Sequence, residues 1–398
     1  MENLIVYAIT MMTMGQILFC LPNVILGLKN KPTHTPLLIF FIANAIIASG
    51  PAIWLLRAEY SIFYIAAIFP AWMLMAPSFW LYVDGLTSHT PWRLGKKHWH
   101  HFVPFLLTTL LSVMILTLPS AQQTALFFEE QDVTEGRALF VAIWLFLTMI
   151  FWLGQSSYYV YRTVKRLSAY HKQLRDLFAN NDKQELHWIK LVLFVICLTW
   201  LLAVGNLLST LLTGAEAFGY QLGSLLMFVI IWTLGHWGLK QKPGFAGRYP
   251  DQTTLESLVS EELSIPRQLS TEKTPEPDKY QKSALSREQA ERLATKIRKA
   301  MESDQLFLDP DLSLSKLATH IVVSPNYLSQ TLNETMNTTF YDFVNGWRIQ
   351  AAIPKILANK DSVLTIALEV GFNARSSFYN VFKKETGLTP TQYRKQHV

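Results

Sequence analysis

The sequence predicts an all-α protein with an apolar part of seven long helices and a polar part of short helices. Half of the 398 residues are hydrophobic and only 16% are charged. The shortage of charge lies almost wholly before residue 240, where seven apolar runs approach the roughly 20 residues that cross a bilayer as a helix. After residue 284 a pattern of short helix, turn and second helix occurs twice. We therefore expect three segments, residues 1–240, 241–283 and 284–398.

The apolar runs predict a transmembrane bundle. They lie near residues 4–28, 36–56, 61–83, 102–118, 138–161, 188–212 and 217–239. The fourth is short and suits a tilted or partly interfacial helix. The first lacks a charged leader and a small-residue cleavage site, so we interpret it as a retained span.

Basic residues predict the orientation of this bundle. The loops after the first, third, fifth and seventh runs hold fourteen Lys and Arg residues, whereas the alternate loops hold only Arg57 and Arg137. The positive-inside rule then places the N-terminus outside and the C-terminus in the cytoplasm. The fourteen residues are Lys29, Lys31, Arg93, Lys96, Lys97, Arg162, Lys165, Arg166, Lys172, Arg175, Lys183, Lys240, Lys242 and Arg248.

The C-terminal end has the pattern of a helix-turn-helix. Apolar residues mark a short helix that ends at Gly371, a residue suited to the left-handed turn. Asn373 is expected to cap the next helix, in which Phe378, Val381 and Phe382 recur at helical spacing. The polar outer face that remains fits a DNA major groove.

A similar pattern occurs about 50 residues earlier. Its turn contains Ser324 and Pro325, typical of a helix start, and its second helix ends near Asn337. A long helix over residues 341–358 is expected to join the two modules. Two such modules can read successive major-groove faces of one duplex.

Residues 284–396 resemble the DNA-binding domain of the AraC/XylS family of bacterial transcription regulators. The resemblance rests on Gly371-Phe372, Ser377-Phe378, Phe382-Lys383-Lys384, Gly387, Thr389-Pro390 and Tyr393-Arg394. It implies a double helix-turn-helix (homeodomain-like) fold and a promoter as partner. The bacterial cytoplasmic membrane is the expected location because of the seven apolar runs, which match a known architecture of membrane-spanning regulators of this type. It implies base-reading roles for Asn326, Ser329, Gln330, Arg375, Ser376, Ser377 and Asn380, with Lys383 and Lys384 on phosphates.

Two positions depart from the family pattern. The first module has Leu332-Asn333-Glu334 where the family usually has Phe-Lys-Lys, so phosphate-contacting charge is missing there. Pro354 falls inside the joining helix, which we expect to bend or divide at that point.

The segment before the modules predicts a linker and one further helix. Residues 241–283 are acidic and rich in proline, typical of a mobile linker. Ser286 and Gln289 form a capping box. Leu293, Ile297 and Met301 then line one face of a helix that can pack on its own domain or pair with its copy in a homodimer.

No motif indicates catalysis, a cofactor or a metal. Cys20 and Cys197 lie in apolar runs, which favours packing roles. The histidines at 98, 100 and 101, with His89, can bind metal, but the neighbouring tryptophans favour an interfacial belt. The seventh run lacks the lysine of a retinal protein, and no carboxylate lies mid-membrane as ion-coupled transport needs.

Two questions stay open in the sequence. Polar residues inside the apolar runs indicate either interhelical hydrogen bonds or a pocket for a small-molecule or membrane signal. These polar residues are Gln16, Asn23, Asn44, Gln155, Ser156, Ser157, Asn206, Gln221 and His236.

The second open question is the function of the C-terminal helices. The competing function is a membrane receptor or scaffold whose C-terminal helices bind protein.

Overall fold

The computed structural model describes residues 2–88, 92–128, 136–180, 186–214, 219–241 and 285–397. Over these ranges the chain is helical and has no β-strand, only an isolated antiparallel bridge between Phe178 and Ser313. The predicted all-α class is therefore confirmed. The chain divides into two compact units, residues 1–168 with 186–244 and residues 169–185 with 245–398. Apart from Gln241, the predicted linker lies outside the described residues.

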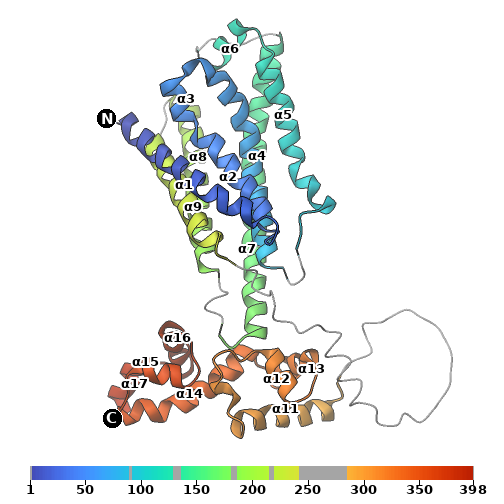
Figure 1. Cartoon of the computed structure of the whole chain (residues 1–398), viewed down its shortest axis with the longest axis vertical. Helices are drawn as coiled ribbons and strands as arrows, with labels where there is room; N and C mark the ends of the chain where they lie inside the picture. Colours follow the sequence, from blue (N-terminus) through green and yellow to red (C-terminus); the bar gives the residue numbers. More distant parts are fainter. Residues whose placement is uncertain are drawn as a thin grey trace, which may run out of the picture. The chain divides into compact units, whose positions relative to one another are not determined.

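The first unit consists of long helices packed side by side (Figure 1). Among the described residues, seven helical stretches are long and apolar enough to cross a membrane, and each overlaps one predicted run. Within the unit α2 packs on α4, α4 on α5, and α1 on both α2 and α9. The helices are α1 (Glu2–Gly27), α2 (His34–Ala48), α3 (Gly50–Leu56), α4 (Ser61–Leu86), α5 (Val103–Leu116), α6 (Ser120–Phe127), α7 (Gly136–Leu177), α8 (His187–Thr213) and α9 (Tyr220–Thr233), with short helices η1 (Ala58–Tyr60), η2 (Lys96–Phe102) and η3 (Leu234–Gly238). The last part of α7, residues 169–177, belongs to the second unit.

The fifth helix continues beyond the predicted apolar run. The run was predicted near residues 138–161, with the following basic residues in a loop, whereas α7 continues to Leu177 and the loop assignment is wrong for residues 162–177. The reason is that apolar residues continue at helical spacing after the continuous apolar run has ended. Leu167, Tyr170 and Leu174 recur at i, i+3 and i+7 and are all buried, so one apolar stripe continues past the basic residues. Lys183 lies outside the described residues.

The second unit is a set of short helices arranged around α14 (Figure 1). The first module comprises α12 and α13, the latter continuing into a π-helical turn, and the second module comprises α15 and α16. The helices are α11 (Arg287–Glu302), η4 (Leu306–Leu308), α12 (Leu314–His320), α13 (Pro325–Gln330), η5 (Thr331–Thr335), α14 (Phe340–Ala358), α15 (Val363–Glu369), α16 (Arg375–Thr386) and α17 (Pro390–His397).

Helix α14 belongs to two hydrophobic cores. Its first half places Phe340 and Val344 in the core of the first module, and its second half places Ile349, Ala352 and Ile356 in the core of the second. One helix thereby fixes the spacing of both modules.

Pro354 does not interrupt α14. The sequence predicted that the helix would bend or divide at this proline, and α14 instead continues as one helix to Ala358, so it does not divide. Pro354 and Gln350, whose carbonyl loses its hydrogen-bond donor, are both exposed. Water can therefore satisfy that carbonyl, which lets the helix continue.

Several helices of this unit begin at hydroxyl caps. Ser313, Ser324 and Ser362 each accept a hydrogen bond from the backbone N–H three residues on, at 3.1–3.3 Å. Ser286 and Gln289 form the predicted capping box at α11. Of the two roles open to α11, packing on its own domain is the one observed, because Leu293, Ile297 and Met301 are buried.

Candidate nucleic-acid interface

The second helix of the first module presents a short polar face. Asn326 is exposed in the first turn of α13, and Ser329 and Gln330 are half-buried. Two of these three side chains already have partners. Gln330 Nε2 donates to Glu334 Oε2 at 2.9 Å, and Asn333 Nδ2 donates to Ser329 Oγ at 3.3 Å. Any base contact by Ser329 or Gln330 must therefore compete with, or extend, these bonds.

A π-helical turn ends this helix at the Leu332-Asn333-Glu334 departure. The Met336 N–H donates to the Thr331 carbonyl, five residues back, at 2.9 Å. Asn337 then adopts a left-handed conformation with φ of 50°, as its position predicted. The wider turn keeps Leu332 buried while Asn333 and Glu334 stay exposed.

The second module presents a larger and more basic face. Arg375, Ser376 and Asn380 are exposed along α16, and Ser377 is half-buried. Arg375 Nη2 donates to the Tyr379 hydroxyl at 3.0 Å, and its guanidinium lies over the Tyr379 ring. Burial alone would raise the pKa of Tyr379, but hydrogen bonds with Arg375 and Thr391, together with the charges of Arg375 and Arg394, outweigh it and lower that pKa.

The two lysines at the end of α16 differ in their surroundings. Both are exposed. Lys384 Nζ lies 2.7 Å from Asp342 Oδ1 of α14, whereas Lys383 has no carboxylate partner among the described residues. Because the first module has Asn333 and Glu334 instead, positive charge for phosphates is concentrated on the second module.

The turn of the second module corrects one expectation. Asn373 does not cap α16, because the cap position is Ala374 and no side chain caps it. Asn373 Nδ2 instead donates to the Pro310 carbonyl at 3.4 Å. Gly371 has φ of 93°, as the turn predicted. A Cβ there would also lie 2.7 Å from the Phe307 carbonyl oxygen, so glycine is required twice over.

The family comparison matches this part of the chain. Residues 317–396 match the family model described as a helix-turn-helix domain. An uncharacterized HTH-type transcriptional regulator of Staphylococcus aureus (strain COL) is 33% identical over 99 residues, which are 25% of this chain and 13% of that protein. The melibiose operon regulatory protein of Escherichia coli (strain K12) is 32% identical over 87 residues, 22% of this chain and 29% of that protein.

The C-terminal unit carries an AraC-type helix-turn-helix domain. The chain spans less than a third of the length of these relatives. Among solved structures, the C-terminal domain of AraT, a response regulator from Geobacillus stearothermophilus, is 30% identical. The match covers 26% of this chain and 88% of that one, with a TM-score of 0.25.

One buried charged side chain of the AraC-type domain was not predicted from the sequence. Arg348 of α14 is fully buried and donates to the Phe307 carbonyl at 2.7 Å and to the Asp309 carbonyl at 2.8 Å. Burial lowers its pKa to about 10, although the nearby Asp309 charge acts to raise it. The available signal was position, since Arg348 lies four residues after Val344 on the core-facing stripe of the predicted helix.

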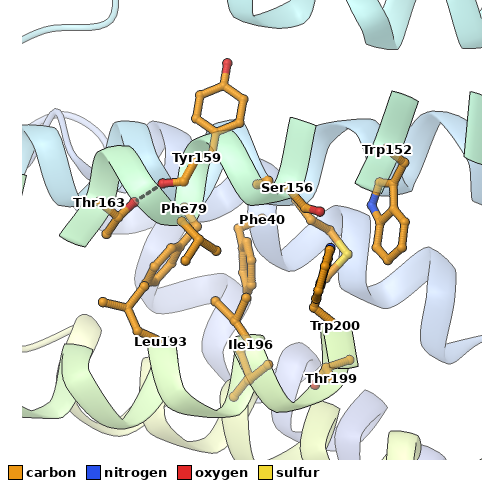
Figure 2. Close-up of a pocket in the computed structure, with 14 residues that line it drawn as sticks. Phe40, Phe79, Trp152, Ser156, Tyr159, Thr163, Leu193, Ile196, Thr199 and Trp200 are labelled. Carbon is orange, nitrogen blue, oxygen red and sulfur yellow. Dashed lines mark hydrogen bonds between the residues drawn. The ribbon is translucent and has the colours of Figure 1, made fainter. Parts of the chain in front are cut away.

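Two of the cavities in the first unit lie next to each other. Figure 2 shows the smaller, of about 100 Å³, whose lining includes Phe40, Phe79, Leu193 and Ile196. The larger, of about 800 Å³, shares Trp152 with it and includes Asn44 and Asn206. Asn44 is buried and donates to the Phe40 carbonyl at 2.8 Å, while its Oδ1 accepts no hydrogen bond in the described part of the chain. Gln155 instead donates across helices to the Met73 carbonyl at 3.5 Å.

The side chains of His98 and His101 take part in hydrogen bonds and ring contacts. The His101 Nδ1 and the Tyr159 hydroxyl share a hydrogen bond of 2.6 Å, and His98 Nδ1 accepts from the Gly95 N–H at 3.1 Å. His98 also lies against Trp92. Over the described ranges, no group of three or more His, Cys, Asp or Glu side chains is placed to hold a metal ion.

Proposed function

We propose that this chain is a membrane-anchored, sequence-specific transcription regulator that carries out no catalysis. The observation that carries the proposal is the presence, in one chain, of two helix-turn-helix modules held on α14 and seven helices apolar enough to cross a membrane. The base-reading residues we propose are Asn326, Ser329, Gln330, Arg375, Ser376, Ser377 and Asn380, with Lys383 and Lys384 on phosphates. Genomic footprinting of the full chain in cells tests this directly, with Arg375→Ala as the comparison.

We propose the cytoplasmic membrane as its location, with the N-terminus outside and the DNA-binding domain in the cytoplasm. Large exposed apolar side chains such as Leu18, Leu26 and Phe194 support burial of the first unit in lipid. A reporter active only in the periplasm should give signal when fused within residues 121–134 and none when fused after Lys242. The reverse result would separate the DNA-binding domain from DNA and end the proposal.

We propose that the membrane helices receive an apolar, hydrogen-bond-donating signal molecule in the larger cavity. Its lining is mainly apolar, and the buried Asn44 Oδ1 offers an acceptor that a ligand hydroxyl can satisfy. Dodecan-1-ol is a suitable probe, and it should raise the melting temperature of the purified chain.

Two glycines give a matched test of that cavity. A Cβ at Gly223, which lines the cavity, or at Gly154, which does not, meets no atom within 4 Å. Gly223→Leu should abolish the response to dodecan-1-ol, while Gly154→Leu should keep it. Equal responses in the two variants would place the ligand elsewhere.

A protein-binding receptor or scaffold is the second candidate function. Glu334, which accepts the hydrogen bond from Gln330, favours it, because a negative charge at the end of this helix repels phosphate. Footprinting that finds no protected promoter, together with capture of one protein partner that Arg375→Ala abolishes, would favour it. Homodimerisation stays a prediction, and because α11 buries its apolar face in its own domain, a dimer needs another surface.

A further inference from the structure

We propose that the second unit contains a peptide-binding cleft between its two helix-turn-helix modules, and that its occupant is the chain's own segment Phe178–Asn180. This segment directly follows α7, the fifth apolar helix. Its role is to hold the two modules in the arrangement that binds DNA and to connect that arrangement to the membrane helix. The regulatory role rests on the proposed function above, whereas occupancy of the cleft does not.

Ala179 seats the segment against the first module. Its side chain is 1% exposed and belongs to the hydrophobic core that contains Leu312 and Leu317. Both of its backbone polar groups are used. Its N–H donates to the Leu312 carbonyl at 3.5 Å, and its carbonyl accepts from Asn345 Nδ2 at 3.0 Å. A small side chain with a fully paired backbone is what a bound peptide in a narrow cleft requires.

Phe178 and Arg175 make further contacts between this part of the chain and the second unit's helices. Phe178 is 5% exposed and forms the antiparallel bridge with Ser313, the residue that caps α12. The Arg175 guanidinium lies 5.2 Å from the centre of the Tyr341 ring, at the start of α14. The contacts therefore reach from the last turn of α7 to the first module and to the helix that joins the modules.

Asn180 connects the two modules through one side chain. Its Nδ2 donates to the Pro310 carbonyl, which precedes the first module, at 2.5 Å. The same Nδ2 donates to the carbonyl of Gly371, in the turn of the second module, at 3.0 Å. An amide is suited to this position because it can donate to two carbonyls while its oxygen remains an acceptor.

The oxygen of that amide completes the coordination of Arg348. Arg348 Nη1 donates to Asn180 Oδ1 at 3.2 Å and to Asn345 Oδ1 at 3.1 Å. A fully buried guanidinium needs acceptors for its N–H groups, and the segment Phe178–Asn180 supplies one that neither module supplies. Withdrawing the segment would leave this charge less well satisfied and would free the carbonyls of Pro310 and Gly371.

The segment Phe178–Asn180 is covalently joined to the fifth apolar helix, which gives it a route for regulation. α7 is one helix from Gly136 to Leu177, and Asn180 follows three residues after its end. A rotation or shift of the fifth apolar helix therefore acts on the segment through a short connection. Two modules that must fit one DNA site together bind best when their relative arrangement is already set.

Hydrogen exchange on the unmodified full chain in lipid nanodiscs tests the occupancy. A peptide covering Ala179 should exchange slowly, because its N–H is buried and hydrogen-bonded. Exchange of this peptide at the rate of an exposed loop would overturn the proposal. This readout needs neither DNA nor a substitution, so it stands even if the chain proves not to bind a promoter.

Substitutions at Asn180 in the full chain test the coupling. Asn180→Ala should lower affinity about tenfold for DNA that contains both half-sites, and should leave affinity for DNA with only the second half-site unchanged. Asn180→Asp keeps an acceptor for Arg348 but cannot donate to the two carbonyls, so it should lose at least as much. Lys172→Ala, at an exposed position near the end of α7, is the matched control.

The outcomes separate the two proposals. Unchanged affinity of Asn180→Ala for both kinds of DNA, or equal loss on both, would overturn the coupling role. Wild-type affinity in Asn180→Asp would show that the bonds to Pro310 and Gly371 do not matter, which also overturns it. Failure of the unmodified chain to bind any promoter would instead remove the proposed function and leave the exchange result to decide occupancy.

Discussion

The guanidinium of Arg375 lies 4.9 Å from the centre of the Tyr379 ring and donates a 3.0 Å hydrogen bond to the hydroxyl of the same residue. The two residues are one helical turn apart on α16, so the ring holds the arginine along the exposed face of the helix. An arginine held in this way loses less conformational entropy when it binds a guanine edge.

Arg375→Ala should therefore cost about 1–3 kcal/mol of binding free energy at one base position, because bidentate contact with guanine is lost. Tyr379→Phe keeps the ring but removes the hydroxyl, and should cost roughly 0.5–1 kcal/mol. Affinities on a panel of single-base variants of the site would measure both. Equal loss on specific and random DNA would show that α16 does not face the groove.

Lys383→Ala should weaken binding to all sequences and reduce the slope of log affinity against log salt by about one charge. Lys384→Ala should have a smaller effect, since Lys384 is already paired with Asp342 at 2.7 Å. Asp342→Asn is the control, and it should increase the contribution of Lys384. Salt titrations of the four proteins decide this, and identical slopes for the two lysine variants would contradict the role we assign to the ion pair.

Gly371→Ala should destabilise a fragment of residues 284–398 by about 2 kcal/mol or more, because it combines a left-handed φ with crowding. The added Cβ would lie 2.7 Å from the Phe307 carbonyl oxygen. Gly387→Ala is a graded comparison, as its φ is 78° but a Cβ there meets nothing within 4 Å. It should cost about 1 kcal/mol.

Gly346→Ala completes this series. Gly346 lies inside α14 with open space around its Cβ position, so alanine should stabilise the fragment by roughly 0.5–1 kcal/mol. Urea denaturation of the three variants gives the order directly. A Gly371→Ala variant no less stable than Gly387→Ala would show that the carbonyls at Phe307 and Leu308 are not in close contact with this turn.

Pro354→Ala should raise the stability of the same fragment by up to about 3 kcal/mol, because it restores a helix donor four residues after Gln350. The position is exposed, so no packing is lost. The same substitution should change the DNA bend or the preferred spacing of half-sites, as α14 sets the distance between the modules. Thermal melting and circular-permutation mobility on one preparation would test both effects, and the idea fails if neither changes.

Local chemistry made much of the fold predictable from the sequence. Ser324 before Pro325, Gly371 and Asn337 in left-handed turns, and Phe378, Val381 and Phe382 at helical spacing each act through neighbours within a few residues. The seven apolar runs are predictable for the same reason, since crossing a bilayer requires a continuous stretch of apolar residues. Exposed Arg375 and Asn380 follow from the side of α16 that its apolar stripe leaves free.

The sequence by itself thus determined the helices, their turns and the candidate reading face. Tertiary structure alone decided which segments meet. Asn180 and Arg348 are 168 residues apart, and the hydrogen bond between their side chains cannot be predicted from the spacing of residues in the sequence. Asn373 resembles a helix cap, yet it donates to the Pro310 carbonyl, 63 residues earlier in the chain. Such contacts depend on packing between elements, which a local pattern does not encode.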